Sequence, residues 1–378
     1  MPTPQLTENE LLEAVSAWRE AGKSVMGGAK LLGMNYSGFK YRLEKAKQNG
    51  LHLSRGARHV VNRAGLSGTE ARGGWIHDYD DDGKKVGTTR WTAPQIETEA
   101  FAESLSIALS NIPSAPDTPP PDISERDLLT LYPVSDLHAG MRAWGEETGE
   151  DYDTEKATRR LFSWLSQCVD ASPASGTAVI LLNGDTLHAD DQTNQTPASR
   201  HVLDMDTRYH MTLDLTVTAI AAAAEYAAKK HGRVIIVTLP GNHDPHAYLA
   251  VMMALFQRYR EHNRIDVKNR PGEWWVHQFG DVMLAAHHGH RAKADRMVHF
   301  LADDYAPIWG RTKYRYLWTG HLHHHKSQDI GGVQHEQLRA VTARDAYAVG
   351  HAYTARAQMQ AITYHRQKGE LQRFKVGL

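Results

Sequence analysis

The chain has 378 residues, with 43 Lys and Arg against 44 Asp and Glu, so its formal net charge is −1. This length allows two or three domains, and the balanced charge excludes a uniformly basic nucleic-acid coat and an acidic disordered chain. The single cysteine, Cys168, excludes an intrachain disulfide framework and a cysteine-based zinc knuckle. There are 23 histidines, and all but His52, His59 and His77 lie at or after His138. This asymmetry indicates metal or acid–base chemistry in the C-terminal part.

The near-zero net charge is the sum of two unequal parts. Residues 21–72 carry ten Lys and Arg and two acids, which gives +8 and leaves −9 for the rest of the chain. We therefore expect a basic N-terminal module joined to a mildly acidic body. No apolar run approaches the roughly 18–20 residues of a membrane span, and the N-terminus lacks the features of a signal peptide. The expectation is a cytoplasmic protein without a membrane partner.

Residues 1–72 are predicted to form a small helical module. Thr7 and Glu10 match a capping box, which begins the first helix. Two more helices are expected over residues 25–32 and 36–47, with a glycine-containing turn between them. This order is typical of a helix-turn-helix, whose second helix enters the DNA major groove. The residues expected to contact DNA are Tyr36, Ser37, Lys40, Tyr41, Arg42 and Lys45. The alternative is an ordinary three-helix module with a solvated basic face.

Two segments separate this module from the body of the chain. Residues 73–92 alternate polar and apolar side chains around a turn at 80–83, which predicts a β-hairpin. Residues 93–127 contain six prolines and several acids. Because proline-rich segments are stiff and extended, we expect a linker that holds two domains apart, with a short helix at about 98–110.

Residues 128–378 are predicted to form one α/β domain, because apolar strand-like runs alternate with helical ones. The expected strands span residues 129–134, 178–182, 234–239, 274–279, 282–287 and 316–319. The expected helices span residues 154–169, 202–230, 247–262 and 292–303. Such an order favours mixed sheets with helices packed against them.

Five short polar motifs each follow one of these apolar runs. They are Asp136-Leu137-His138, Gly184-Asp185, Gly241-Asn242-His243-Asp244, His288-Gly289-His290 and Gly320-His321-Leu322-His323. Together they gather carboxylate, imidazole and amide groups at the carboxyl edge of a sheet, where α/β proteins usually bind ligands. Asp-x-His and His-x-His place two side chains on the same side of an extended segment. A nitrogen and oxygen set without thiolate favours Mn, Fe or Zn, so the motifs predict a metal site.

The order of these motifs resembles the calcineurin-like metallophosphoesterase superfamily, over roughly residues 128–370. The resemblance implies an αββα sandwich with two central mixed sheets and two divalent metal ions, with Mn expected first and Fe or Zn as alternatives. It implies that Asp136, His138, Asp185 and His323 hold one ion, and that Asp185, Asn242, His288 and His321 hold the other. It also implies a metal-bridging hydroxide as nucleophile, His243 as general acid and Asp244 as the partner that orients His243.

Further residues are expected to contact the substrate. His290 and His188 follow ligand motifs closely, and Arg291 and Arg311 belong to a stretch that is rich in basic residues. Within this stretch, residues 309–316 interleave bases with aromatic rings, as a surface that follows a nucleic-acid strand would. The alternative is that these rings pack in the core and the cations are solvated.

The whole layout also resembles architectures encoded by tailed bacteriophages, which implies a DNA-processing enzyme in the cytoplasm of a bacterial host. The superfamily includes DNA repair exonucleases, phosphoprotein phosphatases and cyclic-nucleotide phosphodiesterases. We predict a dinuclear phosphodiesterase that acts on DNA as a nuclease or nicking enzyme, and that is a candidate homodimer. One alternative is a small-molecule phosphatase or cyclic-nucleotide phosphodiesterase. Another is a DNA-binding regulator with an inactive phosphoesterase body.

Overall fold

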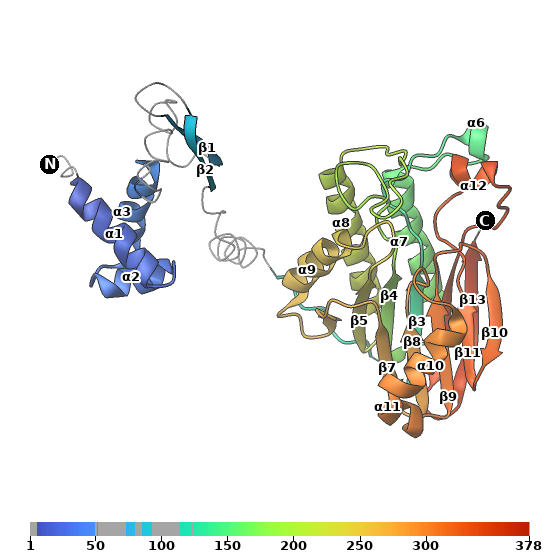
Figure 1. Cartoon of the computed structure of the whole chain (residues 1–378). Coiled ribbons are helices and arrows are strands. Elements are labelled where there is room, and N and C mark those ends of the chain that lie inside the picture. The colour runs from blue at the N-terminus through green and yellow to red at the C-terminus, as the bar shows by residue number, and fades with distance from the viewer. Residues whose placement is uncertain are drawn as a thin grey trace. The chain divides into compact units, whose positions relative to one another are not determined.

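The structure is a computed structural model that describes residues 6–49, 51, 73–79, 85–92, 114–122 and 124–377. The chain divides into two compact units, Met1–Ala108 and Leu109–Leu378 (Figure 1). Most of the predicted linker, including the helix expected at 98–110, lies outside the described residues.

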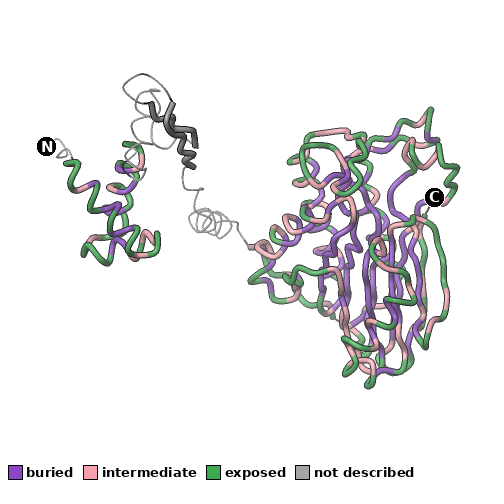
Figure 2. Tube along the Cα trace, viewed as in Figure 1, coloured by how far each residue is buried: buried purple, intermediate pink, exposed green. Residues whose placement is uncertain are grey.

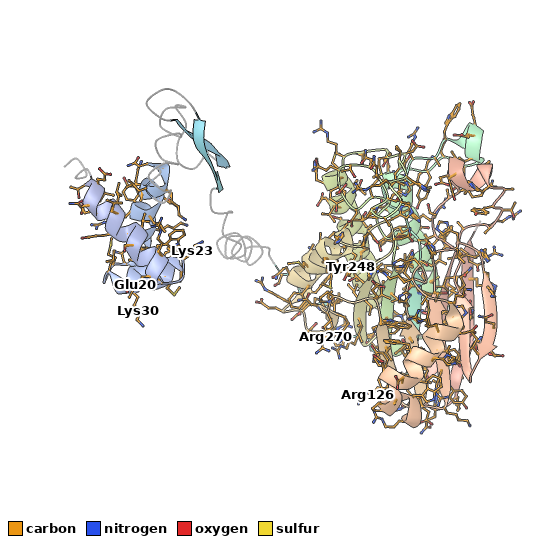
Figure 3. The ribbon with its side chains drawn as sticks, in the orientation of Figure 1. Glu20, Lys23, Lys30, Arg126, Tyr248 and Arg270 are labelled. Carbon is orange, nitrogen blue, oxygen red and sulfur yellow. The ribbon has the colours of Figure 1, made fainter. Side chains whose placement is uncertain are left out.

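The first unit contains three helices. The two whose predicted spans are given above, 25–32 and 36–47, agree with the structure to within one residue. The three helices are α1 (Glu8–Glu20), α2 (Val25–Leu31) and α3 (Tyr36–Gln48). Thr7 forms the predicted capping box with Glu10. Phe39 of α3 is fully buried, and a Cβ atom at Gly28 would come within 2.4 Å of its ring. Glycine therefore allows α2 and α3 to pack closely. Lys23 and Lys30 are exposed on this unit (Figure 3).

The predicted hairpin is present as two antiparallel strands. Strand β1 (Gly73–Tyr79) pairs with β2 (Lys85–Thr92), and the register places Ile76 opposite Thr89. The expected turn at 80–83 lies outside the described residues.

The second unit is built around two mixed sheets. The six-stranded sheet has the order β13-β12-β3-β4-β5-β6, and the five-stranded sheet has the order β10-β11-β9-β8-β7. Its strands are β3 (Glu125–Val134), β4 (Ser175–Asn183), β5 (Arg233–Leu239), β6 (Ile265–Val267), β12 (Gln358–His365) and β13 (Gly369–Gly377) in the first sheet. Those of the second sheet are β7 (Trp275–Phe279), β8 (Val282–Ala286), β9 (Tyr314–Thr319), β10 (Lys326–Ile330) and β11 (Val333–Gln337). Strands β3 to β6 are parallel to one another, whereas β12 is antiparallel to both neighbours.

Alternating side chains in the strands separate the core into layers. In β3, Leu129 and Leu131 face the core between the two sheets, whereas Tyr132 and Val134 face a second core on the other side of the first sheet. This alternation follows from the two-residue period of a strand. The second core contains α7 (Thr154–Ala171), α8 (Tyr209–Ala228) and α9 (Ala247–Tyr259). A third core packs α10 (Ala294–Asp304) and α11 (Ala306–Arg311) on the second sheet. The result is an α/β/β/α sandwich with buried central strands (Figure 2).

The structure differs from the predicted elements at α8, which begins at Tyr209 and not at residue 202. In the irregular segment that precedes α8, Asp206 binds the start of α7. The Asp206 carboxylate accepts hydrogen bonds from the Thr154 N–H at 2.9 Å and the Thr154 hydroxyl at 2.6 Å. Strands β6 and β10 to β13 were not predicted, nor were the short helices α6 (Gly145–Thr148), α11 and α12 (Ala346–Gly350).

The segment 114–122, which the sequence places in the linker, packs along the second unit. The Ala115 N–H donates to the Arg258 carbonyl at 2.8 Å. The Arg264 guanidinium donates to the carbonyls of Thr118 and Pro119. This part of the proline-rich stretch is therefore bound to the α/β unit and is not a free spacer. Among the described residues, no helix combines the length and apolar character needed to cross a membrane.

Candidate metal centre

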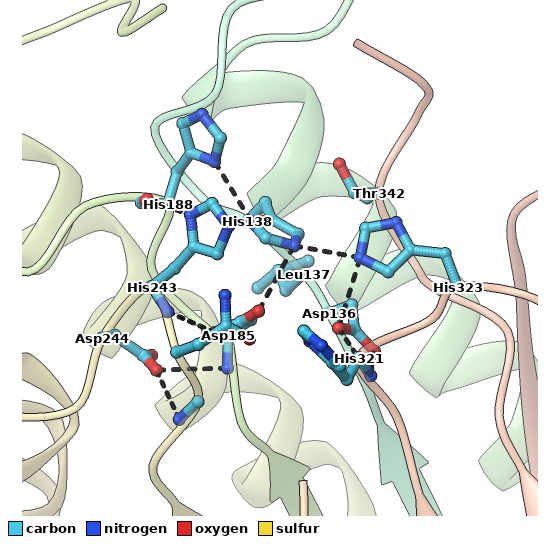
Figure 4. A network of polar contacts seen from close by, with 12 residues as sticks. Asp136, Leu137, His138, Asp185, His188, His243, Asp244, His321, His323 and Thr342 are labelled. Atoms are coloured by element: carbon cyan, nitrogen blue, oxygen red, sulfur yellow. Dashed lines mark hydrogen bonds and ion pairs between the residues drawn. The ribbon is translucent and has the colours of Figure 1, made fainter. Parts of the chain in front are cut away.

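Five loops bring the predicted ligands together at the carboxyl edges of both sheets. Asp136 and His138 follow β3, Asp185 follows β4, and Asn242 follows β5. The second sheet supplies the rest, because His288 follows β8 and His321 and His323 follow β9. Residues up to 187 positions apart in the chain thus meet at one edge, as Figure 4 shows for most of them.

The first group of ligand atoms contains Asp136, His138 and His323. The His323 Nε2 atom lies 3.3 Å from Asp136 Oδ1 and 3.3 Å from His138 Nε2. Two imidazole nitrogens and a carboxylate oxygen therefore point at one another in a buried place. Because lone pairs that converge in this way repel unless a proton or cation lies between them, the arrangement fits a metal ion.

The second group contains Asp185, His288 and His321. Asp185 Oδ2 lies 3.1 Å from His288 Nε2, and the Asn242 Oδ1 atom lies 3.3 Å from the same nitrogen. The same Asp185 oxygen is 3.8 Å from His138 Nε2 of the first group. Asp185 therefore stands between the two groups, where one carboxylate can serve two ions.

The backbone at these ligands is unusual. Among the described residues nine non-glycine residues have positive φ, and five of them are the predicted ligands Asp136, His138, Asp185, His321 and His323. The left-handed region costs a non-glycine residue roughly 1–2 kcal/mol, so the fold holds these loops against their local preference. Such concentrated strain is typical of functional sites.

Glycines next to the ligands have a steric role. A Cβ atom at Gly241 would lie 1.9 Å from Asp185 Oδ1. A Cβ at Gly184 would lie 2.4 Å from His288 Nδ1, and one at Gly320 would lie 2.6 Å from Asp136 Oδ2. Each glycine therefore makes room for a ligand side chain that comes from a different loop.

The electrostatics of the site couple its acids to its imidazoles. Burial raises the pKa of Asp185, but His288, His243 and His138 together outweigh burial and hold this pKa well below its usual range. Burial lowers the pKa of His288, whereas Asp185 raises it, with a net result of about 10. Burial and the nearby His243 hold the pKa of His138 well below its usual value. The carboxylates are thus ionised and need positive partners, which metal ions supply when they are bound.

Hydrogen bonds orient two of the ligand side chains, those of His288 and Asp136. The His288 Nδ1–H donates to the Asn183 carbonyl at 2.8 Å, which leaves Nε2 as the nitrogen that faces Asp185. The Ser135 hydroxyl donates to Asp136 Oδ2. Neither Ser135 nor the Asn183 carbonyl was predicted from the sequence. Ser135 could have been proposed from its position beside Asp136. The Asn183 carbonyl could not, because every residue type has a main-chain carbonyl.

The structure corrects the predicted role of Asp244. Its buried carboxylate does not contact the His243 ring but accepts main-chain hydrogen bonds, at 2.9–3.1 Å, from Asp185, Thr186, Leu187 and Gly241. Burial and the neighbouring Asp185 raise the pKa of Asp244 to about 7, while main-chain N–H donors oppose this rise. Asp244 therefore joins the loops after β4 and β5, and it does not orient His243.

The His243 ring is oriented by the loop after β4 instead. Its Nδ1–H donates to the His188 carbonyl at 2.8 Å, and its ring stacks on the His188 ring at a centroid distance of 5.2 Å. His188 in turn places Nδ1 within 3.1 Å of His138 Nδ1. His188 therefore lies behind the ligand His138 as well as beside His243.

The remaining predicted substrate residues divide between two edges of the second sheet. The His290 ring lies 5.3 Å from the His288 ring, and Arg291 donates to His290 Nε2 and pairs with Glu273. These residues border the site. Arg311 lies in α11, before the amino end of β9, whereas the ligands follow the carboxyl end of that strand. The structure therefore places Arg311 away from the ligands.

The aromatic and basic stretch around Arg311 packs largely on itself. The Arg315 guanidinium lies 4.4 Å from the centre of the Trp309 ring, and it donates to the Trp309 carbonyl. Trp309 packs against the core beneath α10, and Tyr316 is buried between the sheets. This agrees with the alternative interpretation of the stretch, in which the rings belong to the core.

In the helical unit, the predicted DNA contacts share one helix. Tyr36, Ser37, Lys40, Tyr41 and Lys45 are exposed on α3. Arg42 is half-buried and pairs with Glu10 of α1 at 3.2 Å. DNA binding by this face remains a prediction, in which Arg42 now has a competing partner.

Comparisons with known proteins give a distant likeness. No family profile matches the chain, and no curated protein matches it. Among solved structures, a predicted phosphoesterase from Streptococcus pneumoniae is 12% identical, with 66% of this chain and 98% of that chain covered and a TM-score of 0.27. An archaeal phosphodiesterase is 10% identical, with 66% and 99% covered and a TM-score of 0.33. Zinc-bound Vps29 from Entamoeba histolytica is 11% identical, with 66% and 98% covered and a TM-score of 0.27. At such low similarity, no activity transfers from these proteins to this chain.

Proposed function

We propose that the α/β unit is a metal-dependent phosphoesterase with two metal ions, and that its substrate is a phosphodiester of DNA. The observation that carries the proposal is the convergence of two buried carboxylates, four imidazoles and one amide from five loops. Asp185 lies between the two groups of donors, at 3.1 Å from His288 and 3.8 Å from His138. This donor set suits Mn, Fe or Zn.

Two divalent ions would neutralise phosphate charge and make a water acidic enough to supply hydroxide at neutral pH. The chain's own residues would fix the geometry around them. Asp136 and Asp185 supply anionic oxygens, while the Asn183 carbonyl holds His288 in the tautomer that faces inward. Asp244 fixes the loops that carry Asp185 and Asn242.

The general acid in this proposal is His243. Its Nδ1–H is engaged by the His188 carbonyl, so a proton on Nε2 is the one available to the leaving oxygen. The ring is partly exposed and lies 4.6 Å from the ring of the ligand His138. A leaving group beside the ligands would therefore be within its reach.

The proposal of DNA as substrate rests on the helical unit. Lys40, Tyr41 and Lys45 are exposed together on α3, in a region whose net charge is +8. A basic helix with exposed aromatic residues is suited to phosphate contacts in a groove. The observations favour DNA over a small ester because a small ester would not require such a unit.

The test is hydrolysis by the full chain with Mn²⁺, measured on bis-p-nitrophenyl phosphate, plasmid DNA and single-stranded DNA. Asp185→Asn should abolish hydrolysis of every substrate, whereas Asp266→Asn, a carboxylate change at the opposite edge, should have no effect. Lys40→Ala combined with Lys45→Ala should weaken DNA cleavage and leave the small ester unaffected. Activity on the small ester alone would contradict a DNA substrate. Full activity of Asp185→Asn would contradict the proposed centre.

A further inference from the structure

Exposed aromatic rings gather on two short helices that leave the candidate metal centre. Trp144 precedes α6, and Tyr347, His351 and Tyr353 lie on or just after α12. We name these four residues the aromatic rim. The three large rings are more than half exposed, at 54% for Trp144, 57% for Tyr347 and 55% for Tyr353. The helices α6 and α12 contact each other, as Figure 1 also shows.

Both segments of the aromatic rim begin at the ligands. Five residues separate the ligand His138 from Trp144. The other segment starts where the Thr342 N–H donates to the Asp136 carbonyl at 3.1 Å. Four residues separate Thr342 from Tyr347, so their Cα atoms lie at most about 18 Å apart. The rim is therefore within reach of a strand bound at the centre.

Arg344 holds the two segments together. Its guanidinium donates to the Thr148 carbonyl of α6 at 3.1 Å and to the Tyr353 carbonyl at 3.3 Å. Asp345 accepts from the Ala348 N–H at 2.8 Å and so begins α12. The rim is thus a built feature of the fold, because its rings are carried by segments with fixed main-chain contacts.

Three rings of the rim, those of Tyr347, His351 and Tyr353, lie close together with their planes tilted. The Tyr347 and His351 centroids are 4.0 Å apart with an angle of 33° between the planes, and His351 and Tyr353 are 5.8 Å apart at 31°. Flat rings that are open to solvent can take a further flat ring on their free faces. Nearby charges are mixed, since Arg142 and Arg356 are exposed but Glu146 and Glu147 are exposed too. Stacking, and not charge alone, would therefore provide the affinity.

We propose that the aromatic rim binds unpaired bases of the DNA strand whose phosphodiester lies at the metal centre. The inference rests on the proposed function, and it names single-stranded DNA as the form that the site accepts. Stacking of a base on an aromatic side chain contributes about 1–3 kcal/mol and tolerates any base. The rim would therefore favour single strands over duplex without reading a sequence.

The test measures binding by the full chain in a chelator, so that hydrolysis does not interfere. The probe is a fluorescent 15-mer of deoxythymidine, with a 15-base-pair duplex for comparison. Tyr347→Ala combined with Tyr353→Ala should weaken binding of the 15-mer by at least about 10-fold and change duplex binding less than 2-fold. Tyr347→Phe combined with Tyr353→Phe keeps the stacking faces and should bind as the wild type does. Phe374→Ala, a partly exposed ring on β13, serves as the matched control.

A second measurement needs no variant. Photocrosslinking of the wild-type protein to a bromodeoxyuridine 15-mer should label peptides that contain Tyr347, Tyr353 or Trp144. Unchanged affinity of the alanine pair, labelling confined to other peptides, or self-association through the rim would each overturn the proposal. Failure of the wild type to hydrolyse bis-p-nitrophenyl phosphate would overturn the proposed function instead, and the binding measurement in chelator keeps the two failures apart.

Discussion

Histidines lie at the amino edge of the first sheet and at the carboxyl edges of both sheets, and their surroundings differ in kind. At the amino edge, His231 lies just before β5, with Nε2 2.7 Å from the Tyr132 hydroxyl and Nδ1 2.7 Å from the Ser175 hydroxyl. At the carboxyl edge, His138 and His323 face each other's nitrogens and a carboxylate. The first histidine is satisfied by neutral partners, whereas the others converge and leave donor atoms for a cation. Convergence, and not burial or abundance, marks the candidate site.

The largest predicted effect is the loss of activity when one of the histidines at the carboxyl edge is removed. His323→Ala should lower the rate of ester hydrolysis about 1,000-fold and weaken Mn²⁺ binding in calorimetry, because a donor to the ion is lost. His325→Ala, two positions further along the same loop, should change either quantity less than twofold. Equal losses of activity and Mn²⁺ binding in the two variants would contradict the assignment of His323 as a metal ligand.

The second effect concerns stability and belongs to the amino edge. Burial, followed by the charge of Lys230, lowers the pKa of His231 to about 4. Above about pH 6.5 the imidazole is neutral in the folded and unfolded chains. As the pH falls from 6.5 towards 4, only the unfolded chain takes up the proton, so the free energy of unfolding should fall by about 3 kcal/mol through this residue.

Urea unfolding at pH 7 and pH 4.5 checks this expectation. Other buried histidines such as His335 also have a lowered pKa, so the contribution of His231 is the difference between the wild type and His231→Leu. The variant should be less stable at pH 7 but lose less on acidification. His299→Leu, a change on the exposed face of α10, should show the wild-type pH dependence. The same pH dependence in both variants would contradict the assignment.

The smallest effect is expected at the amino edge of the second sheet. Arg311→Ala should change DNA cleavage by less than about twofold, because α11 and the ligands lie at opposite ends of β9. The comparison variant is Arg291→Ala at the carboxyl edge, where Arg291 pairs with Glu273 at 2.8 Å and borders His290. A larger loss for Arg311 than for Arg291 would show that substrate extends to the amino edge.

Strands that are continuous apolar runs could be predicted from the sequence, whereas polar strands such as β10 and β11 could not. Strands β3, β4, β5 and β8 are buried on both faces and read as continuous apolar runs. Strand β10 has a mostly exposed polar sequence. In β11 buried polar residues bind partners on other strands, as Glu336 does with Arg373 of β13 at 2.7 Å. Apolar periodicity does not detect a strand whose buried side chains are charged.

In the candidate site, the sequence predicts the side chains but not their main-chain partners. Residue types and order sufficed to predict which side chains gather, including His188 and His290 at the border. They did not reveal what each one contacts, because the acceptors for His243 and His288 are main-chain carbonyls. The assignment of Asp244 was wrong for this reason, since adjacency in sequence does not show that its carboxylate bonds to four N–H groups.

The attachment of residues 114–122 has a consequence for dividing the chain. Arg264 donates to Thr118, Pro119, Ala228, His231 and Gly232 carbonyls, so one guanidinium ties this segment to the start of β5. A fragment that starts at Leu128, where the sequence places the domain boundary, would remove two of these acceptors and expose the surface beneath them. A fragment that starts at Ser114 keeps them all. The hydrogen bonds of Arg264 therefore place the start of the α/β unit at or before Thr118, well before the first predicted strand.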